Sequence, residues 1–159
     1  MGIAIDKPVP DFIATATSGK DIDFARLRGW NVVIYFYPKD DTPGCTLEGQ
    51  GFRDHYDAFK EARTLVFGVS RDSLKSHDKF RCKYSLPFEL ISDADEALCR
   101  LFDVIRTKNM YGKQVQGIER STFLVDADGV LRKAWRGVKV DGHVAAVLAA
   151  AQALPAAPA

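Results

Sequence analysis

Apolar and polar positions follow two different periods along the 159-residue chain, and the change of period predicts where strands and helices lie. Residues 30–37 are almost continuously apolar, β-branched or aromatic and stop at Pro38, which is typical of a buried central strand. Thr64–Ser70 has the same character. From Pro43 to about Ala62 the apolar residues recur with helical spacing, so we expect a helix there.

The remaining segments continue this alternation of strands and helices. A turn at 18–20 between 12–17 and 22–24 predicts a short hairpin, and Asp126-Ala127-Asp128-Gly129 predicts a second turn between strands 121–125 and 130–135. We also expect helices at 73–84, 95–102 and 142–154, a short strand at 88–91, a polar loop at 110–116 and a frayed tail at 155–159. Strands that alternate with helices predict an α/β fold with a layered sheet, and the length allows one domain over 1–159.

Composition and charge exclude several classes of protein. The chain has 22 Lys and Arg against 21 Asp and Glu, a net charge of +1, which excludes a strongly basic nucleic-acid footprint. The longest apolar runs, 32–37 and 144–151, are far shorter than the roughly 20 residues that cross a bilayer. Residues 1–12 contain no apolar segment of the secretory kind. We therefore expect a cytoplasmic protein with no nucleic-acid or membrane partner.

The three cysteines are Cys45, Cys82 and Cys99. An odd number in a chain of this size fits a reducing compartment, where a free thiol is either core filler or chemistry. Thr42 is a good N-cap and Pro43 suits the first helical position, so Cys45 should be the third residue of its helix. The helix N-terminus favours thiolate over thiol there, and thiolate is the reactive form. By position alone, Cys45 is as readily a small buried residue as a nucleophile.

Longer motifs favour the nucleophile. The pattern Pro38-x-x-x-Thr42-x-x-Cys45 resembles the peroxidatic motif of the peroxiredoxins, and the run 36–54 is similar to the bacterioferritin comigratory protein group, also called peroxiredoxin Q. Residues 117–124, which include Arg120, resemble the segment that carries the active-site arginine of that group. The similarity extends over about residues 4–150.

This resemblance implies a thioredoxin-like fold, with a central mixed sheet flanked by helices and an N-terminal β-hairpin. It also implies thiol-dependent reduction of hydrogen peroxide and alkyl hydroperoxides. Cys45 would be the peroxidatic nucleophile, Thr42 would donate a hydrogen bond to the bound peroxide, and Arg120 would polarise the peroxide and stabilise the thiolate. Pro38 would shield the pocket from water. No metal, haem, flavin or other cofactor is implied, and the recycling partner would be thioredoxin or a similar dithiol.

The residues leave open which thiol resolves the Cys45 sulfenic acid. Many members of the group place a cysteine five residues later, where this chain has Gln50, and others place it on the later helix that carries Cys82. Helical angles put Cys82 opposite the apolar face of 73–84 and among lysines, which favour thiol ionisation. Cys99 lies off the apolar face of its own helix and beside carboxylates, which oppose ionisation. We favour Cys82; Cys99 and a one-cysteine cycle with an external thiol remain alternatives.

A Cys45–Cys82 disulfide would join two different helices. Because a disulfide needs Cα atoms roughly 5.5–6 Å apart, we expect one or both helices to unwind. Gly44, Gly49 and Gly51 crowd the start of the Cys45 helix, and each weakens a helix interior. These glycines either ease unwinding or permit close packing.

Other polar residues have plainer interpretations. Asp126-x-Asp128-Gly129 lacks the remaining ligands of a calcium loop and reads as a turn. His55, His77 and His143 have no metal-ligand spacing and read as surface or capping residues, while Lys75, Lys79 and Lys83 read as a solvated face. Glu48 either complements the helix N-terminus or contacts the site. Without the resemblance, Arg120 would read as an ion pair with Glu119.

Two functions of other kinds compete with a peroxidase. A cysteine hydrolase would need a histidine within hydrogen-bond reach of Cys45, and His55 lies ten residues down the same helix, about 15 Å away. A redox-sensing or chaperone-like protein of the same fold would show thiol oxidation without turnover. We expect a monomer, because no extended C-terminal arm is present for exchange between partners.

Overall fold

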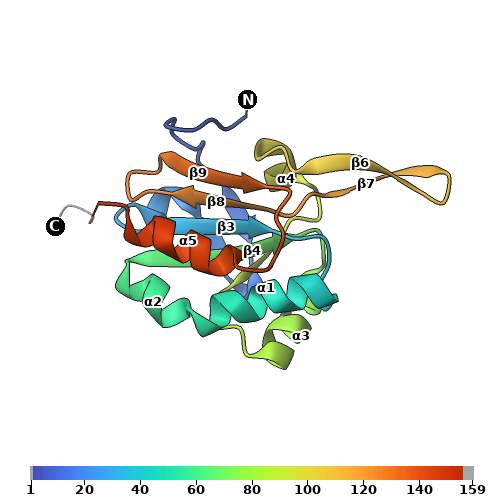
Figure 1. Ribbon diagram of the computed structural model, residues 1–159, viewed down its shortest axis with the longest axis horizontal. Helices are drawn as coiled ribbons and strands as arrows, with labels where there is room; N and C mark the ends of the chain where they lie inside the picture. Colours follow the sequence, from blue (N-terminus) through green and yellow to red (C-terminus); the bar gives the residue numbers. More distant parts are fainter. Residues whose placement is uncertain (1, 156–159) are drawn as a thin grey trace.

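The computed structural model describes residues 2–155, so most of the predicted tail, 156–159, lies outside the described residues. A five-stranded sheet runs in the order β5-β4-β3-β8-β9 (Figure 1). At its centre β3 pairs in parallel with β4 and antiparallel with β8, so the sheet is mixed. The outer strands continue these directions, because β5 is parallel to β4 and β9 is antiparallel to β8. The bounds are β3 Asn31–Phe36, β4 Thr64–Ser70, β5 Leu90–Ser92, β8 Ser121–Val125 and β9 Leu131–Arg136.

The central strand β3 is buried on both faces, as its continuous apolar run predicts. Its side chains alternate between two core clusters: Val32, Ile34 and Phe36 enter one, while Val33 and Tyr35 enter the other. The sheet therefore separates two hydrophobic cores.

Different helices cover the two faces (Figure 1). Side chains of α1, α2, α3 and α5 complete the core that contains Tyr35. The opposite core is closed by α4 and the N-terminal segment, including the predicted hairpin of β1 and β2. The bounds are α1 Pro43–Asp54, α2 Tyr56–Glu61, α3 Leu74–Tyr84, α4 Ala97–Leu101, α5 His143–Gln152, β1 Ile13–Thr15 and β2 Asp21–Asp23, with 3-10 turns η1 Thr17–Gly19 and η2 Phe24–Leu27.

The helix predicted from Pro43 to about Ala62 is two helices, α1 and α2, with a break at His55. The backbone of His55 leaves the helical region, with φ −103° and ψ 6°. Its ring Nδ1 lies 2.9 Å from the carbonyl oxygen of Gly51, on the last turn of α1. Apolar periodicity continues across the break because Phe52 and Phe59 enter the same core.

The loop predicted at 110–116 is wrong, because β6 (Ile105–Met110) and β7 (Lys113–Ile118) form an antiparallel hairpin there. Both faces of most of this hairpin are exposed, so the apolar alternation that reveals a half-buried strand is missing. The turn residues Tyr111 and Gly112 both have positive φ, 53° and 79°, which is the geometry of a tight two-residue hairpin turn. Figure 1 shows the hairpin projecting from one end of the sheet.

The turn predicted between β8 and β9 is confirmed. The Asp126 carboxylate accepts hydrogen bonds from the amides of Asp128 and Val130, at 2.9 and 3.0 Å. Gly129 has φ 81°. One carboxylate oxygen, Oδ1 of Asp126, therefore holds both ends of the turn.

Candidate active site

Cys45 lies at the start of α1, directly after the loop that leaves β3. Thr42 is the N-cap and Pro43 the first helical residue, so Cys45 is the third, as predicted. The Thr42 side chain accepts no hydrogen bond from α1; its hydroxyl donates to the carbonyl of Lys39 at 2.9 Å. The Cys45 side chain is buried, with 2% of the residue exposed, in the core that also holds Tyr35.

Arg120 reaches Cys45 from the segment between β7 and β8. Its Nη2 donates to Cys45 Sγ at 3.4 Å, and its Nη1 donates to Glu48 Oε1 at 2.7 Å. One guanidinium therefore contacts the sulfur and a carboxylate together. Glu119 instead lies 3.8 Å from Arg106, so the alternative pairing of Arg120 with its neighbour is wrong.

Glu48, one turn after Cys45, contacts the site rather than only complementing the helix N-terminus. It is fully buried, and its Oε2 has no hydrogen-bond partner among the described residues. Burial raises the pKa of Glu48 to about 7, against the opposing effect of the Arg120 guanidinium. The carboxyl group can thus hold or release a proton near neutral pH, beside the arginine that contacts the sulfur.

Two glycines of α1 permit close packing. A Cβ atom on Gly44 would lie 3.1 Å from Arg120 Nη2, and one on Gly51 would lie 2.9 Å from Val144 Cγ2. A Cβ on Gly49 would meet Leu86 only at 3.6 Å, an ordinary contact. Of the two readings offered for these glycines, packing accounts for Gly44 and Gly51, and easier unwinding stays a prediction for Gly49.

The remaining predicted site residues lie at different depths. Pro38 is exposed in the loop after β3, and its shielding role stays a prediction. Cys82 is exposed on α3, as its helical angle predicts. The lysines named beside it, Lys75, Lys79 and Lys83, are exposed too, which confirms a solvated face.

The expected position of Cys99 off the apolar face is wrong, because Cys99 is fully buried. The Asp93 carboxylate accepts hydrogen bonds from the amides of Leu98 and Cys99, at 3.0 and 2.8 Å. Asp93 thus satisfies two amides of the first turn of α4. Burial, followed by Asp93, raises the pKa of the Cys99 thiol well above its usual range. The carboxylates expected to oppose ionisation were Asp95, Glu96 and Asp103, but the larger effects come from burial and Asp93, and of the three only Glu96 contributes.

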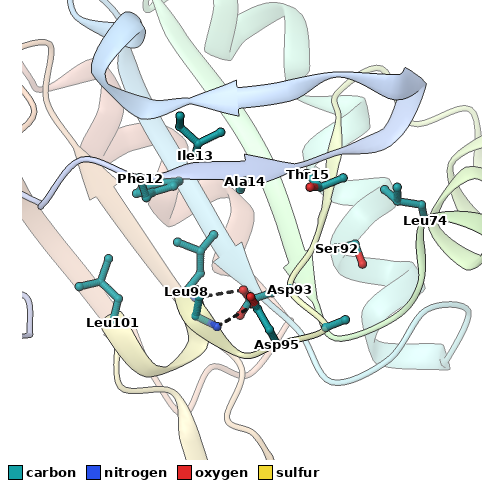
Figure 2. A pocket seen from close by; sticks show the side chains of 12 residues that line it. Phe12, Ile13, Ala14, Thr15, Leu74, Ser92, Asp93, Asp95, Leu98 and Leu101 are labelled. Atoms are coloured by element: carbon teal, nitrogen blue, oxygen red, sulfur yellow. Dashed lines mark hydrogen bonds between the residues drawn. The ribbon is translucent and has the colours of Figure 1, made fainter.

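A cavity of about 460 Å³ lies between β1 and α4. Figure 2 shows Phe12 and Ile13 on one side, with Asp93 and Leu98 opposite. The residues that line it do not include Cys45, so this cavity is separate from the thiol.

The three histidines were expected to be surface or capping residues. This is confirmed for His55, which is exposed and contacts the last turn of α1, and it is wrong for His77 and His143, which are buried. His77 bonds to Asp40 and to the Ile91 carbonyl, and His143 bonds to the Thr122 hydroxyl at 2.8 Å. Each buried ring therefore has at least one hydrogen-bond partner inside the protein. Within residues 2–155, Arg120 supplies the one side-chain hydrogen bond to Cys45 Sγ, so the hydrolase alternative lacks its base.

Comparison with known proteins assigns the family. The AhpC/TSA family model matches residues 5–134. A peroxiredoxin Bcp of Xanthomonas campestris pv. campestris is 62% identical over 143 residues, which are 90% of this chain and 89% of that protein. This chain belongs to the AhpC/TSA family, the peroxiredoxins. A peroxiredoxin Bcp of Bacillus subtilis is 45% identical over 148 residues, 93% of this chain and 94% of that protein.

A solved structure extends this result to three dimensions. The bacterioferritin comigratory protein of X. campestris, solved to study its alkyl peroxide reduction activity, aligns with a TM-score of 0.86 at 54% identity. The alignment covers 89% of this chain and 90% of that one. The peroxiredoxin therefore has the thioredoxin-like fold that its motifs predict, and it is a thiol-dependent peroxidase of the peroxiredoxin Q group. Within the described residues, none of the helices has the length and apolar character needed to cross a membrane.

Proposed function

We propose that Cys45 is the peroxidatic cysteine and that Cys82 resolves its sulfenic acid. The Cys45 thiolate attacks the terminal oxygen of a hydroperoxide; the S–O bond forms as the O–O bond breaks. The alkoxide leaves and takes a proton to become the alcohol, and Cys45 is left as the sulfenic acid. The contact that carries this proposal is Arg120 Nη2 at 3.4 Å from Cys45 Sγ.

Arg120 acts on both charges of this step. A guanidinium beside the sulfur favours thiolate, and its remaining N–H groups can stabilise negative charge as it moves onto the peroxide oxygens. The Glu48 carboxylate at 2.7 Å fixes the orientation of the guanidinium. Thr42 is proposed to donate to the bound peroxide, which requires its hydroxyl to exchange the hydrogen bond to the Lys39 carbonyl for one to the substrate. Pro38 is proposed to limit water at the loop.

The proposed resolution uses the exposed thiol. The Cys82 thiol attacks the Cys45 sulfenic sulfur; the S–O bond breaks, the S–S bond forms and water leaves. A dithiol reductant of the thioredoxin type then reduces this disulfide and is itself oxidised. The burial of Cys99 and the raised pKa of its thiol support Cys82 over Cys99.

Three free cysteines, two of them buried, support a reducing compartment such as the cytoplasm as the place of action. Substrates in this proposal are hydrogen peroxide and alkyl hydroperoxides. The alkyl class is supported by the reported activity of the X. campestris relative.

Peroxide consumption with thioredoxin, its reductase and NADPH tests the cycle. Wild type should turn over, and Cys45→Ser should not. Peptide mapping after one equivalent of peroxide should give a Cys45–Cys82 crosslink. An over-oxidised Cys45 without a crosslink favours the one-cysteine cycle, and thiol oxidation without turnover favours the redox-sensing or chaperone-like alternative.

A further inference from the structure

A buried carboxylate in the loop between β3 and α1 holds the helix that carries Cys82. Asp40 is 7% exposed and lies two residues before the N-cap of α1. Its carboxylate accepts from the Tyr37 hydroxyl at 2.6 Å and from the Ser76 hydroxyl at 2.8 Å. It also lies 2.7 Å from Nδ1 of His77. Because Ser76 and His77 belong to α3, this one side chain joins the active-site loop to that helix.

The contact between Asp40 and His77 contains a proton. His77 is fully buried, and its Nε2 lies 2.9 Å from the carbonyl oxygen of Ile91. A carbonyl only accepts, so Nε2 carries a hydrogen atom. Nδ1 lies 2.7 Å from a carboxylate oxygen, so a second proton lies between them. The pair is a charge-assisted hydrogen bond shielded from water, the kind of contact that is costly to break.

The next residue adds an outer contact to the same helix. The Asp41 carboxylate accepts from Lys83 Nζ at 2.7 Å and from the Tyr84 hydroxyl at 2.8 Å. Asp41 has φ 58°, in the left-handed region. Asp40 contacts the first turn of α3 and Asp41 contacts its last turn. Because both partners of the Lys83 pair are solvent-exposed, we expect this contact to contribute much less than the Asp40 contact.

These contacts lie on both sides of Cys82. The inner contact uses Ser76 and His77, and the outer one uses Lys83 and Tyr84, so Cys82 belongs to the segment of α3 that the loop holds. Cys82 is exposed while Cys45 is buried. A bond between a buried and an exposed sulfur requires α1, α3 or both to move, and the loop that holds α3 leads directly into α1.

We propose that Asp40 and His77 are positioning residues that latch α3 to the active-site loop and limit the rate at which the Cys45 sulfenic acid condenses with Cys82. The proposal rests on the proposed function, because it requires Cys82 as the resolving thiol. While the latch is closed, a second hydroperoxide can oxidise the sulfenic acid to sulfinic acid and leave as its alcohol. The strength of the latch thus divides the oxidised enzyme between the disulfide and the sulfinic acid.

The test follows two steps separately in the full-length protein. After mixing with hydrogen peroxide, samples are quenched, alkylated and weighed by mass spectrometry, which separates thiol, disulfide and sulfinic acid. Asp40→Asn removes the charge and one acceptor oxygen, so the remaining oxygen can accept from Tyr37 or from Ser76 but not from both. We expect disulfide formation to become about tenfold faster and the sulfinic fraction to fall, with Cys45 oxidation unchanged within about twofold. Ser76→Ala, a milder change, should accelerate disulfide formation about threefold.

Val125→Ala is the matched control. Val125 is fully buried in the opposite core, so its truncation destabilises the protein without touching the latch. It should leave the ratio of disulfide to sulfinic acid unchanged. Wild type that forms the Cys45–Cys82 disulfide while Asp40→Asn and Ser76→Ala form it no faster overturns the latch alone. Wild type that forms no such disulfide overturns the proposed resolving step, and the latch with it.

Discussion

At the scale of single residues, one guanidinium contacts the thiol and a buried carboxylate together. Arg120 Nη2 and Nη1 contact Cys45 and Glu48, at 3.4 and 2.7 Å. A lysine can replace the charge but not the two-pronged geometry, because its ammonium is a single point charge. The shape of the side chain therefore matters here in addition to its sign.

We predict that Arg120→Lys lowers the second-order rate constant of Cys45 oxidation by about 100-fold, the usual effect of removing one transition-state donor. Single-turnover oxidation by hydrogen peroxide measures this constant. Arg106→Lys is the matched control, since Arg106 pairs with Asp103 and Glu119 rather than with the thiol. A rate for Arg120→Lys within threefold of wild type would contradict the proposed role.

Glu48 couples the site to pH. Its pKa is about 7 in the native state and 4.5 in the reference state, so between these values the native state holds a proton that the unfolded state has released. The free energy of unfolding contributed by Glu48 therefore falls as pH rises from about 4.5 to 7, by about 3 kcal/mol in total. Relative to wild type, Glu48→Gln should remove a fall of this size from the pH dependence of the free energy of unfolding, as measured by urea unfolding at several pH values. Equal pH slopes in wild type and variant would show that Glu48 is not perturbed.

His143 changes the free energy of unfolding in the opposite direction to Glu48, over nearly the same pH range. Burial, and then the Arg120 charge, lower the pKa of His143 from 6.5 to about 4. The unfolded state then binds the extra proton, so this contribution to the free energy of unfolding rises with pH between about 4 and 6.5. We expect His143→Gln to steepen the fall that Glu48 causes, whereas Glu48→Gln should reveal the rise.

At the scale of elements, α1 has a buried thiol near its start and contains three glycines. The neighbours of two of these glycines differ in a useful way. A Cβ on Gly49 would make ordinary contacts, whereas a Cβ on Gly51 would press on Val144 of α5. Replacing each of these two glycines by alanine therefore separates the effect on helix stability, at Gly49, from the effect on packing, at Gly51.

We predict that Gly49→Ala stabilises α1 by up to about 1 kcal/mol and slows disulfide formation about threefold, because the helix unwinds less readily. Gly51→Ala should lower the free energy of unfolding by about 1–3 kcal/mol, because Val144 must shift. Urea unfolding measures the change in stability, and the quench, alkylation and mass-spectrometry experiment described above measures the rate of disulfide formation. Equal disulfide rates in Gly49→Ala and wild type would mean that glycine content does not set the unwinding step.

At the scale of the whole molecule, the large exposed apolar side chains of the described residues lie on four segments. Ile5, Ile13 and Leu47 lie on separate segments, and three others, Met110, Tyr111 and Val115, lie on the β6–β7 hairpin. A stable dimer buries about 800 Å² per partner around an apolar centre, and three side chains on one hairpin supply little of that area.

We therefore predict a monomer of 17.6 kDa, measured by light scattering after size-exclusion chromatography at micromolar concentration. A mass twice as large would contradict this prediction. Tyr111→Ser would then test the hairpin as the interface, because Tyr111 is completely exposed at its turn.

Local patterns predicted the elements that carry apolar periodicity. The strands of the central sheet, the hairpin of β1 and β2, the start of α1 and the exposed position of Cys82 all follow from residues close together in the chain. The β6–β7 hairpin did not, because it buries little and so leaves no alternating signal. The break at His55 was also missed, since the apolar spacing continues through it.

By itself the sequence determined the order of strands and helices, the place of Cys45 at a helix N-terminus and, through its motifs, the expectation that Arg120 faces the sulfur. Only the tertiary structure decided that Glu48, His77, His143 and Cys99 are buried. The physical reason is distance along the chain. Arg120 meets Cys45 across 75 positions and Glu48 across 72, and His77 meets Asp40 across 37. Burial and the protonation state of a side chain depend on such partners, which no local pattern contains.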